Sequence, residues 1–350
     1  MIAHVPRLRV LLALVVLLVC GPAVGAPAAA ADPRPTAVVA LGDSAAAGEG
    51  AGDYRAGTRG EAGNWCHRSP HAYVHRTGLA GTAVNLACSG ARSGDVGFGP
   101  GTHHTEGSQA ARLVQVAQRY RVDTVVVQAG ANDDVALRDT GVACILALLE
   151  PPRRPCRDSL GPLLDGRLHA TAAKVRAALR DVREAMRRAG YADADYRLVL
   201  ASYAAPVTER MVPLAAAGGC PYRVADAGWA RTVLFPRLSE ALRGVAADVG
   251  ARFLDLTRGT EGREACSRPW PGQEWQRRLT VDPGAFVHGG PTGVGYHLAQ
   301  ESFHPKAAAH RQVGRCLGEF VRSGEAGAAC VPGADGRLHL ERTRRAEAPA

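Results

Sequence analysis

The segment TAVVALGDSAAAGEG, residues 36–50, joins a short apolar run to Gly-Asp-Ser and then to a series of small residues. The apolar run at 37–41 predicts a buried strand. A serine that directly follows a strand is usually a helix cap or a turn residue, but it can also be a nucleophile. The rest of the sequence has to decide between these two interpretations of Ser44.

Further apolar runs and helical periodicities alternate along the chain. The additional strands are predicted at 83–87, 123–130, 196–203 and 251–256. The helices are predicted at 107–121, 168–190, 227–250 and 305–323, with Pro236 expected to break the third of them. Strands that alternate with helices favour a parallel sheet covered on both faces. The prediction is therefore a three-layer α/β/α sandwich with a central, mostly parallel five-stranded sheet.

The two ends of the chain differ in composition from its centre. Residues 1–31 contain Arg7 and Arg9, then an apolar run, then small residues, which is the order typical of a secretory signal peptide cleaved near Ala31. Residues 32–330 are predicted to form a single domain. Residues 331–350 are charged and rich in Pro and Ala, and a loosely ordered tail is expected there. We therefore expect a secreted, extracellular protein.

The composition of the 350-residue chain suits one large domain with a hydrophobic core, since 46% of its residues are hydrophobic. The net charge is +9, and nearly all positive charges are arginines. These arginines are scattered along helical stretches without a basic block. We interpret them as solvated helix faces and expect no nucleic-acid partner.

Eight cysteines remain when the signal segment, which holds Cys20, is removed. They are Cys66, Cys88, Cys144, Cys156, Cys220, Cys266, Cys316 and Cys330. An even number in an exported chain indicates disulfides, although eight cysteines allow about 105 connectivities. We favour sequential pairing: 66–88, 144–156, 220–266 and 316–330. No C-x-x-C pair occurs, which argues against a cysteine zinc site.

Three of the predicted strands are followed by groups that could act in catalysis. Ser44 follows the first strand, Gly90 the second and Asn132 the third. Active sites of parallel sheets form at these carboxyl ends. A hydroxyl, a glycine with an approachable backbone and a side-chain amide provide a nucleophile and two kinds of oxyanion donor. The missing base would be His304, which precedes the last predicted helix.

These segments resemble the four sequence blocks of the SGNH, or GDSL-type, serine hydrolases. The blocks are ALGDSAAAG, NLACSGARS, VVVQAGANDD and ESFHP. They occur in the family's order between residues 40 and 305, and the cysteine pattern resembles that of secreted actinobacterial members with sequential disulfides. The resemblance implies an esterase or lipase that uses neither a metal nor an organic cofactor.

The resemblance also implies a role for each matching residue. Ser44 would be the nucleophile and His304 the general base, while the N–H groups of Ser44 and Gly90 and the amide of Asn132 would form the oxyanion hole. The family's histidine block has Asp three residues before the histidine, where this chain has Glu301. Either the Glu301 carboxylate or the main-chain carbonyl of Ser302 would orient the imidazole, and both alternatives remain open.

The resemblance does not select the substrate. A carboxylic ester of a lipid or of a small molecule is expected, with transient contact to a lipid surface and a monomeric state. The alternatives to this function are a carbohydrate acetyl esterase, a phospholipase, and a catalytically weak lipid- or glycan-binding protein that keeps the fold.

Two groups of histidines lie outside these blocks. His67, His71 and His75 are spaced by four residues, but Pro70 interrupts any continuous helix face, so surface or packing roles are favoured over metal binding. His103 and His104 lie in a Gly-rich segment and could line the cleft, but a solvated loop is favoured there.

Overall fold

The structure, a computed structural model, describes residues 32–150, 152–293 and 295–342. The predicted signal peptide, residues 1–31, lies outside the described residues, as do residues 343–350. The chain divides into Met1–Pro33 and Arg34–Ala350, and every element below belongs to the second unit. In the described part, no helix has the length and apolar character needed to cross a membrane.

A seven-stranded sheet forms the centre of this unit, in the order β2-β1-β3-β4-β5-β6-β7. The strands are β1 (Thr36–Gly42), β2 (Thr82–Asn85), β3 (Arg121–Gln128), β4 (Arg197–Ala201), β5 (Arg252–Asp255), β6 (Gly327–Pro332) and β7 (Leu338–Arg342). All neighbours pair in parallel except β6 and β7, which are antiparallel. The mostly parallel α/β fold is confirmed.

The strand count and the position of the tail differ from the prediction. The five predicted strands are present, but β6 and β7 extend the sheet, so the ordered chain continues past residue 330 to Arg342. The sequence of β6, GAACVP, contains little more than small residues and a proline, and that of β7, LHLER, is half charged or polar. Neither has the run of large apolar residues that marks a central strand. Of the two, β7 lies at the sheet's edge, while β6 pairs with β5 on one side and β7 on the other.

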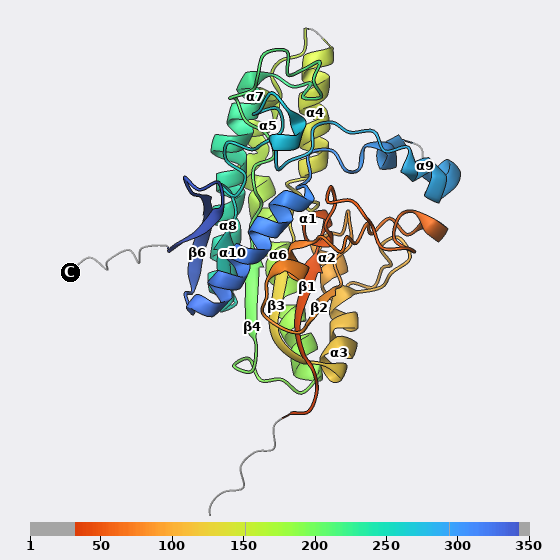
Figure 1. Cartoon of the computed structure of the whole chain (residues 1–350), viewed down its shortest axis with the longest axis vertical. Helices are drawn as coiled ribbons and strands as arrows, with labels where there is room; N and C mark the ends of the chain where they lie inside the picture. The colour runs from red at the N-terminus through yellow and green to blue at the C-terminus, as the bar shows by residue number, and fades with distance from the viewer. Residues whose placement is uncertain (1–31, 151, 294, 343–350) are drawn as a thin grey trace, which may run out of the picture. The chain divides into compact units, whose positions relative to one another are not determined.

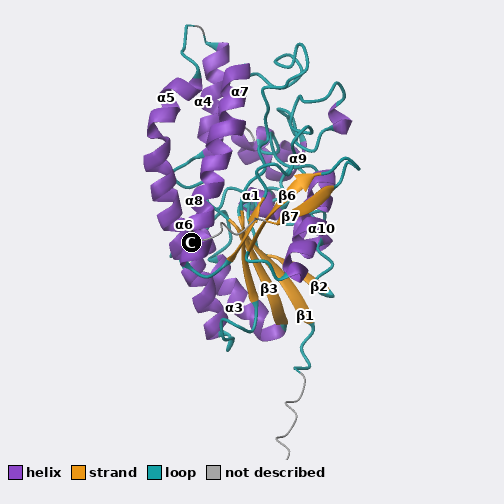
Figure 2. Cartoon of the chain, turned by 90° about the vertical axis from the view of Figure 1, so that its left-hand side faces the viewer, coloured by secondary structure: helices purple, strands orange, loops and turns teal. Residues whose placement is uncertain are grey.

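Helices cover both faces of the sheet. The longer ones are α3 (Gln109–Arg119), α4 (Leu137–Leu149), α6 (Leu164–Arg188), α8 (Phe235–Asp248) and α10 (Ala307–Ser323). The shorter ones are α1 (Ser44–Ala47), α2 (Ser93–Val96), α5 (Cys156–Leu160), α7 (Val224–Trp229) and α9 (Gly284–Gly289). Figure 2 shows α3, α6 and α8 on one side of the strands and α10 on the other. These are the three layers of the predicted sandwich.

Alternate residues of each central strand supply the two cores. Val125 and Val127 of β3 face the core beneath α3, α6 and α8, while Val126 between them faces the core beneath α10. The helix α6 contributes buried Leu168, Val175 and Leu179 on one face, at the spacing of an amphipathic helix. A strand that is apolar at consecutive positions is thus explained by burial on both faces.

The predicted break at Pro236 is wrong. The chain runs from α7 through a π-helical segment, Ala230–Leu234, into α8, and Pro236 lies in the first turn of α8. Proline has no N–H to donate to the preceding turn, and the π-helical turn carries the chain past this position in helical geometry. The irregularity is therefore the π-helical turn that precedes the proline.

Four disulfides join the cysteines in sequential pairs. The pairs are Cys66–Cys88, Cys144–Cys156, Cys220–Cys266 and Cys316–Cys330. The first ties the segment before β2 to the turn after it, and the third joins the loop after β4 to the loop after β5. The second joins α4 to the start of α5, and the fourth joins α10 to β6. Two of the four cross-links therefore lie in the loops that surround the carboxyl edge of the sheet.

Candidate active site

The turn after β1 places Ser44 at the carboxyl edge of the sheet, at the start of α1 (Figure 1). Gly42 has φ 139°, and a Cβ there would lie 2.0 Å from the carbonyl oxygen of Gln128 on β3, so the turn admits only glycine. The chain passes from β1 to β2 on one side and then to β3 on the other. Ligands bind at such a reversal of strand order in open α/β sheets.

Asp43 holds this turn. Its carboxylate accepts a hydrogen bond from the N–H of Ala45, as the N-cap of α1, and another from the hydroxyl of Tyr203 at 2.5 Å. Burial raises the pKa of Asp43 to about 7, and the Tyr203 hydrogen bond opposes this effect. A fully buried carboxyl with these partners supports the turn beneath Ser44 and does not itself face a substrate.

Ser44 and His304 are in direct contact. The Ser44 Oγ lies 2.8 Å from Nε2 of His304, and Nδ1 of the same ring lies 3.0 Å from the carbonyl oxygen of Ser302. Since a carbonyl oxygen can only accept, Nδ1 carries the hydrogen, and Nε2 is left to accept the proton of the serine hydroxyl. Burial lowers the pKa of His304, although Glu49 and the Ser302 carbonyl oppose this shift.

The Glu301 carboxylate is directed away from this ring. It accepts a hydrogen bond of 2.5 Å from the Tyr54 hydroxyl and pairs with Arg277 Nη1 at 3.1 Å. Arg277 in turn donates from Nε to the carbonyl of Gly50 and from its backbone N–H to the carbonyl of His304. Of the two alternatives left open by the sequence, the geometry thus places the Ser302 carbonyl, and not Glu301, on the imidazole.

A second buried carboxylate, which the sequence analysis missed, lies behind the histidine. Glu49 is fully buried and contacts Nδ1 of His67 at 2.9 Å, the Ser89 hydroxyl at 2.5 Å and the Gln300 amide at 2.8 Å. Burial alone would raise the pKa of Glu49, but the charge and hydrogen bond of His67 dominate and lower it to about 2. The only sequence signal for this site was that Glu49 is a charged residue among small residues.

Gly90 and Asn132 lie in the same cavity wall as Ser44 and His304. Gly90, after β2, has φ 81°, a left-handed conformation that glycine adopts without strain. Asn132, after β3, donates one amide hydrogen to the carbonyl of Ala91 at 3.0 Å. A primary amide has two donors, so this bond fixes the side chain while a second N–H remains for a ligand.

The cavity beside Ser44 has a volume of about 310 Å³. Its walls come from α4, from the α7–α8 segment and from the loops after β4 and β5. The apolar side chains that line it include Leu137, Val142, Ile145, Val207, Trp229, Leu234, Phe235, Leu279 and Phe303. A hydrophobic slot that opens next to a serine hydroxyl can hold the acyl chain of an ester.

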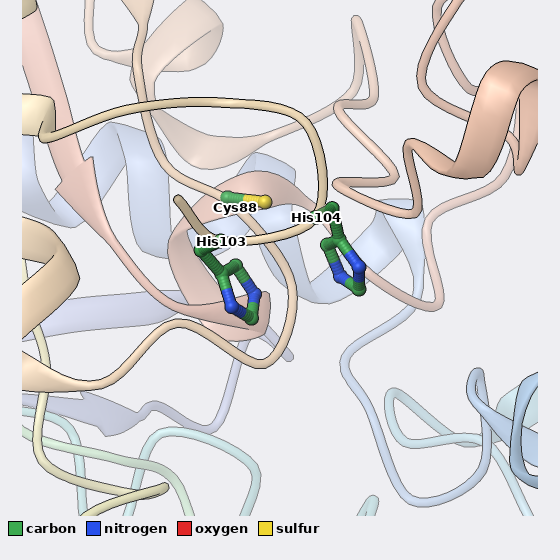
Figure 3. A group of neighbouring side chains, drawn as sticks. All are labelled: Cys88, His103 and His104. Carbon is green, nitrogen blue, oxygen red and sulfur yellow. The ribbon is translucent and has the colours of Figure 1, made fainter. Parts of the chain in front are cut away.

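Two groups of three potential metal ligands occur among the described residues. One is Cys88, His103 and His104, shown in Figure 3, and the other is Cys144, Cys156 and Asp226. All three cysteines are disulfide-bonded, so none offers a thiolate. Neither group has the chemistry of a metal site.

A serine–histidine pair, potential oxyanion donors and an apolar cavity at the edge of a parallel sheet define the class of serine hydrolases. The sequence model of the GDSL-like Lipase/Acylhydrolase family matches residues 40–312. The chain belongs to this family and is a carboxylic ester hydrolase. It is 30% identical over 271 residues to Lipase 2 of Streptomyces coelicolor, an alignment that covers 75% of this chain and 82% of that protein.

Solved structures show the same fold. The extracellular lipase of Streptomyces rimosus superposes with a TM-score of 0.50 at 23% identity, covering 82% of this chain and 99% of that chain. Phospholipase A1 of Streptomyces albidoflavus gives a TM-score of 0.51 at 21% identity, with coverages of 83% and 99%. The fold is therefore that of the SGNH hydrolases.

Proposed function

We propose that this protein is a secreted serine esterase or lipase that hydrolyses carboxylic esters through an acyl-enzyme on Ser44, with His304 as general base. The observation that carries the proposal is the 2.8 Å contact between Ser44 Oγ and His304 Nε2 beside an apolar cavity. A nucleophile and base within hydrogen-bond reach, with the base oriented by a third group, is the signature of covalent acyl transfer.

In the first half of the reaction, Ser44 Oγ attacks the ester carbonyl carbon while its proton passes to Nε2 of His304. The carbonyl oxygen becomes an oxyanion, which the N–H groups of Ser44 and Gly90 and the Asn132 amide stabilise. The C–O bond to the alcohol then breaks, and Nε2 returns the proton to the leaving alkoxide oxygen. The product of this half-reaction is the free alcohol and an ester on Ser44.

In the second half, water replaces the alcohol. Nε2 of His304 accepts a proton from the water as its oxygen attacks the acyl carbon, and it then returns that proton to Ser44 Oγ as the acid departs. Throughout the cycle the Ser302 carbonyl keeps the hydrogen on Nδ1. A carbonyl fixes the tautomer in this way, and its dipole stabilises the imidazolium less than a carboxylate would.

The apolar lining supports an acyl group longer than acetyl. Walls formed by Ile145, Trp229 and Phe235 offer hydrophobic contact to a hydrocarbon chain and few hydrogen-bond partners for a sugar. Each buried methylene contributes about 0.8 kcal/mol. Specificity constants for p-nitrophenyl esters are therefore expected to rise from acetate towards longer chains.

Two measurements test the enzyme and its nucleophile. The purified mature protein should hydrolyse p-nitrophenyl esters and react with a fluorophosphonate probe, and Ser44→Ala should do neither. Ser159→Ala, which changes an exposed serine on α5 that does not line the cavity, is the matched control and should behave like the wild type. Equal hydrolysis by wild type and Ser44→Ala on every chain length would refute the proposal.

Secretion is part of the proposal and rests on two observations. The order of charged, apolar and small residues in 1–31 is that of a signal peptide, and the mature part contains four disulfides, which persist in oxidising compartments. Protein collected from the culture medium of a secreting host should begin after Ala31. A protein retained in the cell with residues 1–31 intact would contradict this part.

We also propose that the protein is a monomer that contacts lipid surfaces transiently. Exposed apolar side chains lie on α4, on α9 and on the segment that leads into α9, namely Val142, Leu279, Val281, Phe286 and Val287. Two of them, Val142 and Leu279, also line the cavity. Co-sedimentation with phosphatidylcholine vesicles should fall in a Phe286→Asp, Val287→Asp variant, and light scattering should give the mass of one chain.

A further inference from the structure

We propose that His103, with His104 beside it, is a positioning residue that fixes and polarises the peptide group between Ser89 and Gly90. The inference rests on the proposed function, in which the N–H of Gly90 stabilises the oxyanion. The carbonyl oxygen of Ser89 and the N–H of Gly90 belong to the same planar peptide group. Whatever holds that oxygen therefore also sets the direction of the N–H.

Both imidazole rings contact this one oxygen. Nε2 of His103 lies 2.7 Å from the Ser89 carbonyl oxygen, and Nε2 of His104 lies 3.2 Å from it. Because the carbonyl only accepts, each Nε2 carries a hydrogen and donates it. The His103 ring also borders Gly90, since a Cβ on Gly90 would lie 3.4 Å from His103 Nε2. Figure 3 shows the two rings side by side next to Cys88.

The backbone of this loop is shaped to bring two consecutive rings to one point. Successive side chains of an extended chain point to opposite sides, but His104 has φ 53°, in the left-handed region that non-glycine residues rarely adopt. Such a conformation costs energy and persists only where the surrounding structure enforces it. The sequence predicted a solvated loop here, and the structure shows a constrained one instead.

The enforcing contacts come from Glu106. His103 and Glu106 exchange two backbone hydrogen bonds, of 2.8 and 3.0 Å. The Glu106 carboxylate is in turn paired with Arg68 and Arg112 and accepts a hydrogen bond from Asn64 at 3.0 Å. The loop that carries both histidines is thus anchored by a part-buried group of charges.

Ser89 is held from its other sides as well. Its hydroxyl donates to Glu49 at 2.5 Å, and its N–H donates to the carbonyl of Cys66 at 3.1 Å. The neighbouring Cys88 is cross-linked to Cys66. With the side chain and the N–H of Ser89 both fixed, the hydrogen bonds from the histidines complete the restraint on the peptide plane.

This arrangement favours the transition state in two ways. A donor that is already aligned requires no reorganisation when the oxyanion forms. A hydrogen bond to the oxygen of an amide also strengthens donation from its N–H, by about 10–30% per bond. His104 acts as a neutral donor at neutral pH, since burial, and after it the charge of His103, lowers its pKa to about 4.

The test compares two substitutions at His103. His103→Phe keeps a planar ring but removes the donor, whereas His103→Gln keeps a donating nitrogen. We expect His103→Phe to lower kcat about 10- to 100-fold. This loss is smaller than the loss of about 10²–10³ seen when an oxyanion donor is deleted. KM and the melting temperature should change little, affinity for an alkyl boronic acid should fall with kcat, and His103→Gln should restore most of the activity.

His339→Phe on β7 is the matched control and should match the wild type. The proposal is overturned if His103→Phe keeps wild-type kcat, or if His103→Gln is as impaired as His103→Phe, since a restored donor would then fail to restore activity. A loss confined to the melting temperature also overturns it. Failure of the proposed function would give a different result. The wild type itself would then neither hydrolyse esters nor react with the fluorophosphonate, and the inference about His103 would fall with it.

Discussion

Glu301 and Arg277 form an ion pair at 3.1 Å, and this contact keeps the carboxylate away from the imidazole that lies three residues later. Arg277 also donates its backbone N–H to the carbonyl of His304, so the ion pair helps to fix the backbone of the histidine. The hydrogen-bond partner of the ring nitrogen Nδ1 is the Ser302 carbonyl. A carboxylate near a catalytic histidine is therefore no proof of a triad.

The first prediction concerns this carboxylate. Glu301→Gln should lower kcat less than about 10-fold, because loss of a true triad acid costs about 10⁴. Glu301→Ala should cost more, mainly in stability, since Arg277 would lose its buried partner. Steady-state kinetics on a p-nitrophenyl ester and thermal denaturation separate the two effects. Glu184→Gln, at an exposed carboxylate on α6, is the control. A loss of kcat of about 10⁴ in Glu301→Gln would instead show that Glu301 is the acid of a catalytic triad.

The second prediction concerns the amide of Asn132. Asn132→Ala should reduce kcat about 10²–10³-fold with little change in KM, because the proposed role of the amide is to bind the oxyanion and not the ground-state ester. The Asn132–Ala91 hydrogen bond is a single, part-buried contact, so the fold should persist. Circular dichroism checks the fold alongside the kinetics. A large rise in KM at constant kcat would instead indicate a substrate-binding role.

The third prediction concerns the acid limb of the pH–rate profile. His304 accepts a proton only when neutral, so activity should fall as pH drops through its pKa. Burial lowers that pKa below the ordinary value of 6.5, and the negative charge of Glu301 is one of the influences that raise it. The midpoint of kcat/KM should thus lie below pH 6.5 in the wild type and lower still in Glu301→Gln. A shift to higher pH would contradict this electrostatic account.

The fourth prediction concerns the disulfides. Cys220–Cys266 spans 46 residues and Cys144–Cys156 spans 12. In the chain-entropy treatment these loops contribute about 4 and about 3 kcal/mol, so replacing the first pair by alanines should lower the free energy of unfolding more than replacing the second. Urea denaturation of the two double variants measures the difference. The reverse order would show that native-state packing, and not loop closure, dominates.

The sequence predicted the parts of the site that lie at strand ends. Ser44, Gly90 and Asn132 each follow an apolar run, and the carboxyl ends of parallel strands meet at one edge, so their convergence followed from the strand pattern. The strands β1, β3, β4 and β5 could be recognised because their burial on both faces leaves a continuous apolar signal. The strand β2 lies at the sheet's edge, but its apolar run still marked it. The strands β6 and β7 were missed because their sequences, GAACVP and LHLER, lack a continuous run of large apolar residues.

The supporting groups could not be predicted in the same way. Glu49 and Gln300 are hydrogen-bonded although 251 positions separate them in the sequence, and neither belongs to a local periodicity. The direction of the Glu301 side chain depends on Arg277, which arrives from a separate loop. Side-chain orientation of this kind is set by tertiary contacts, whereas propensity and spacing report only on the local backbone.

The strand order has a consequence for the size of the oxyanion site. Since β1 lies between β2 and β3, the groups proposed to hold the oxygen come from the ends of three adjacent strands, on both flanks of Ser44. Neighbouring strands are spaced about 4.8 Å apart by their backbone hydrogen bonds. The width of the cradle is thus a property of the sheet itself, so the loops around it can change in length and sequence to admit new esters without altering the grip on the reacting carbonyl.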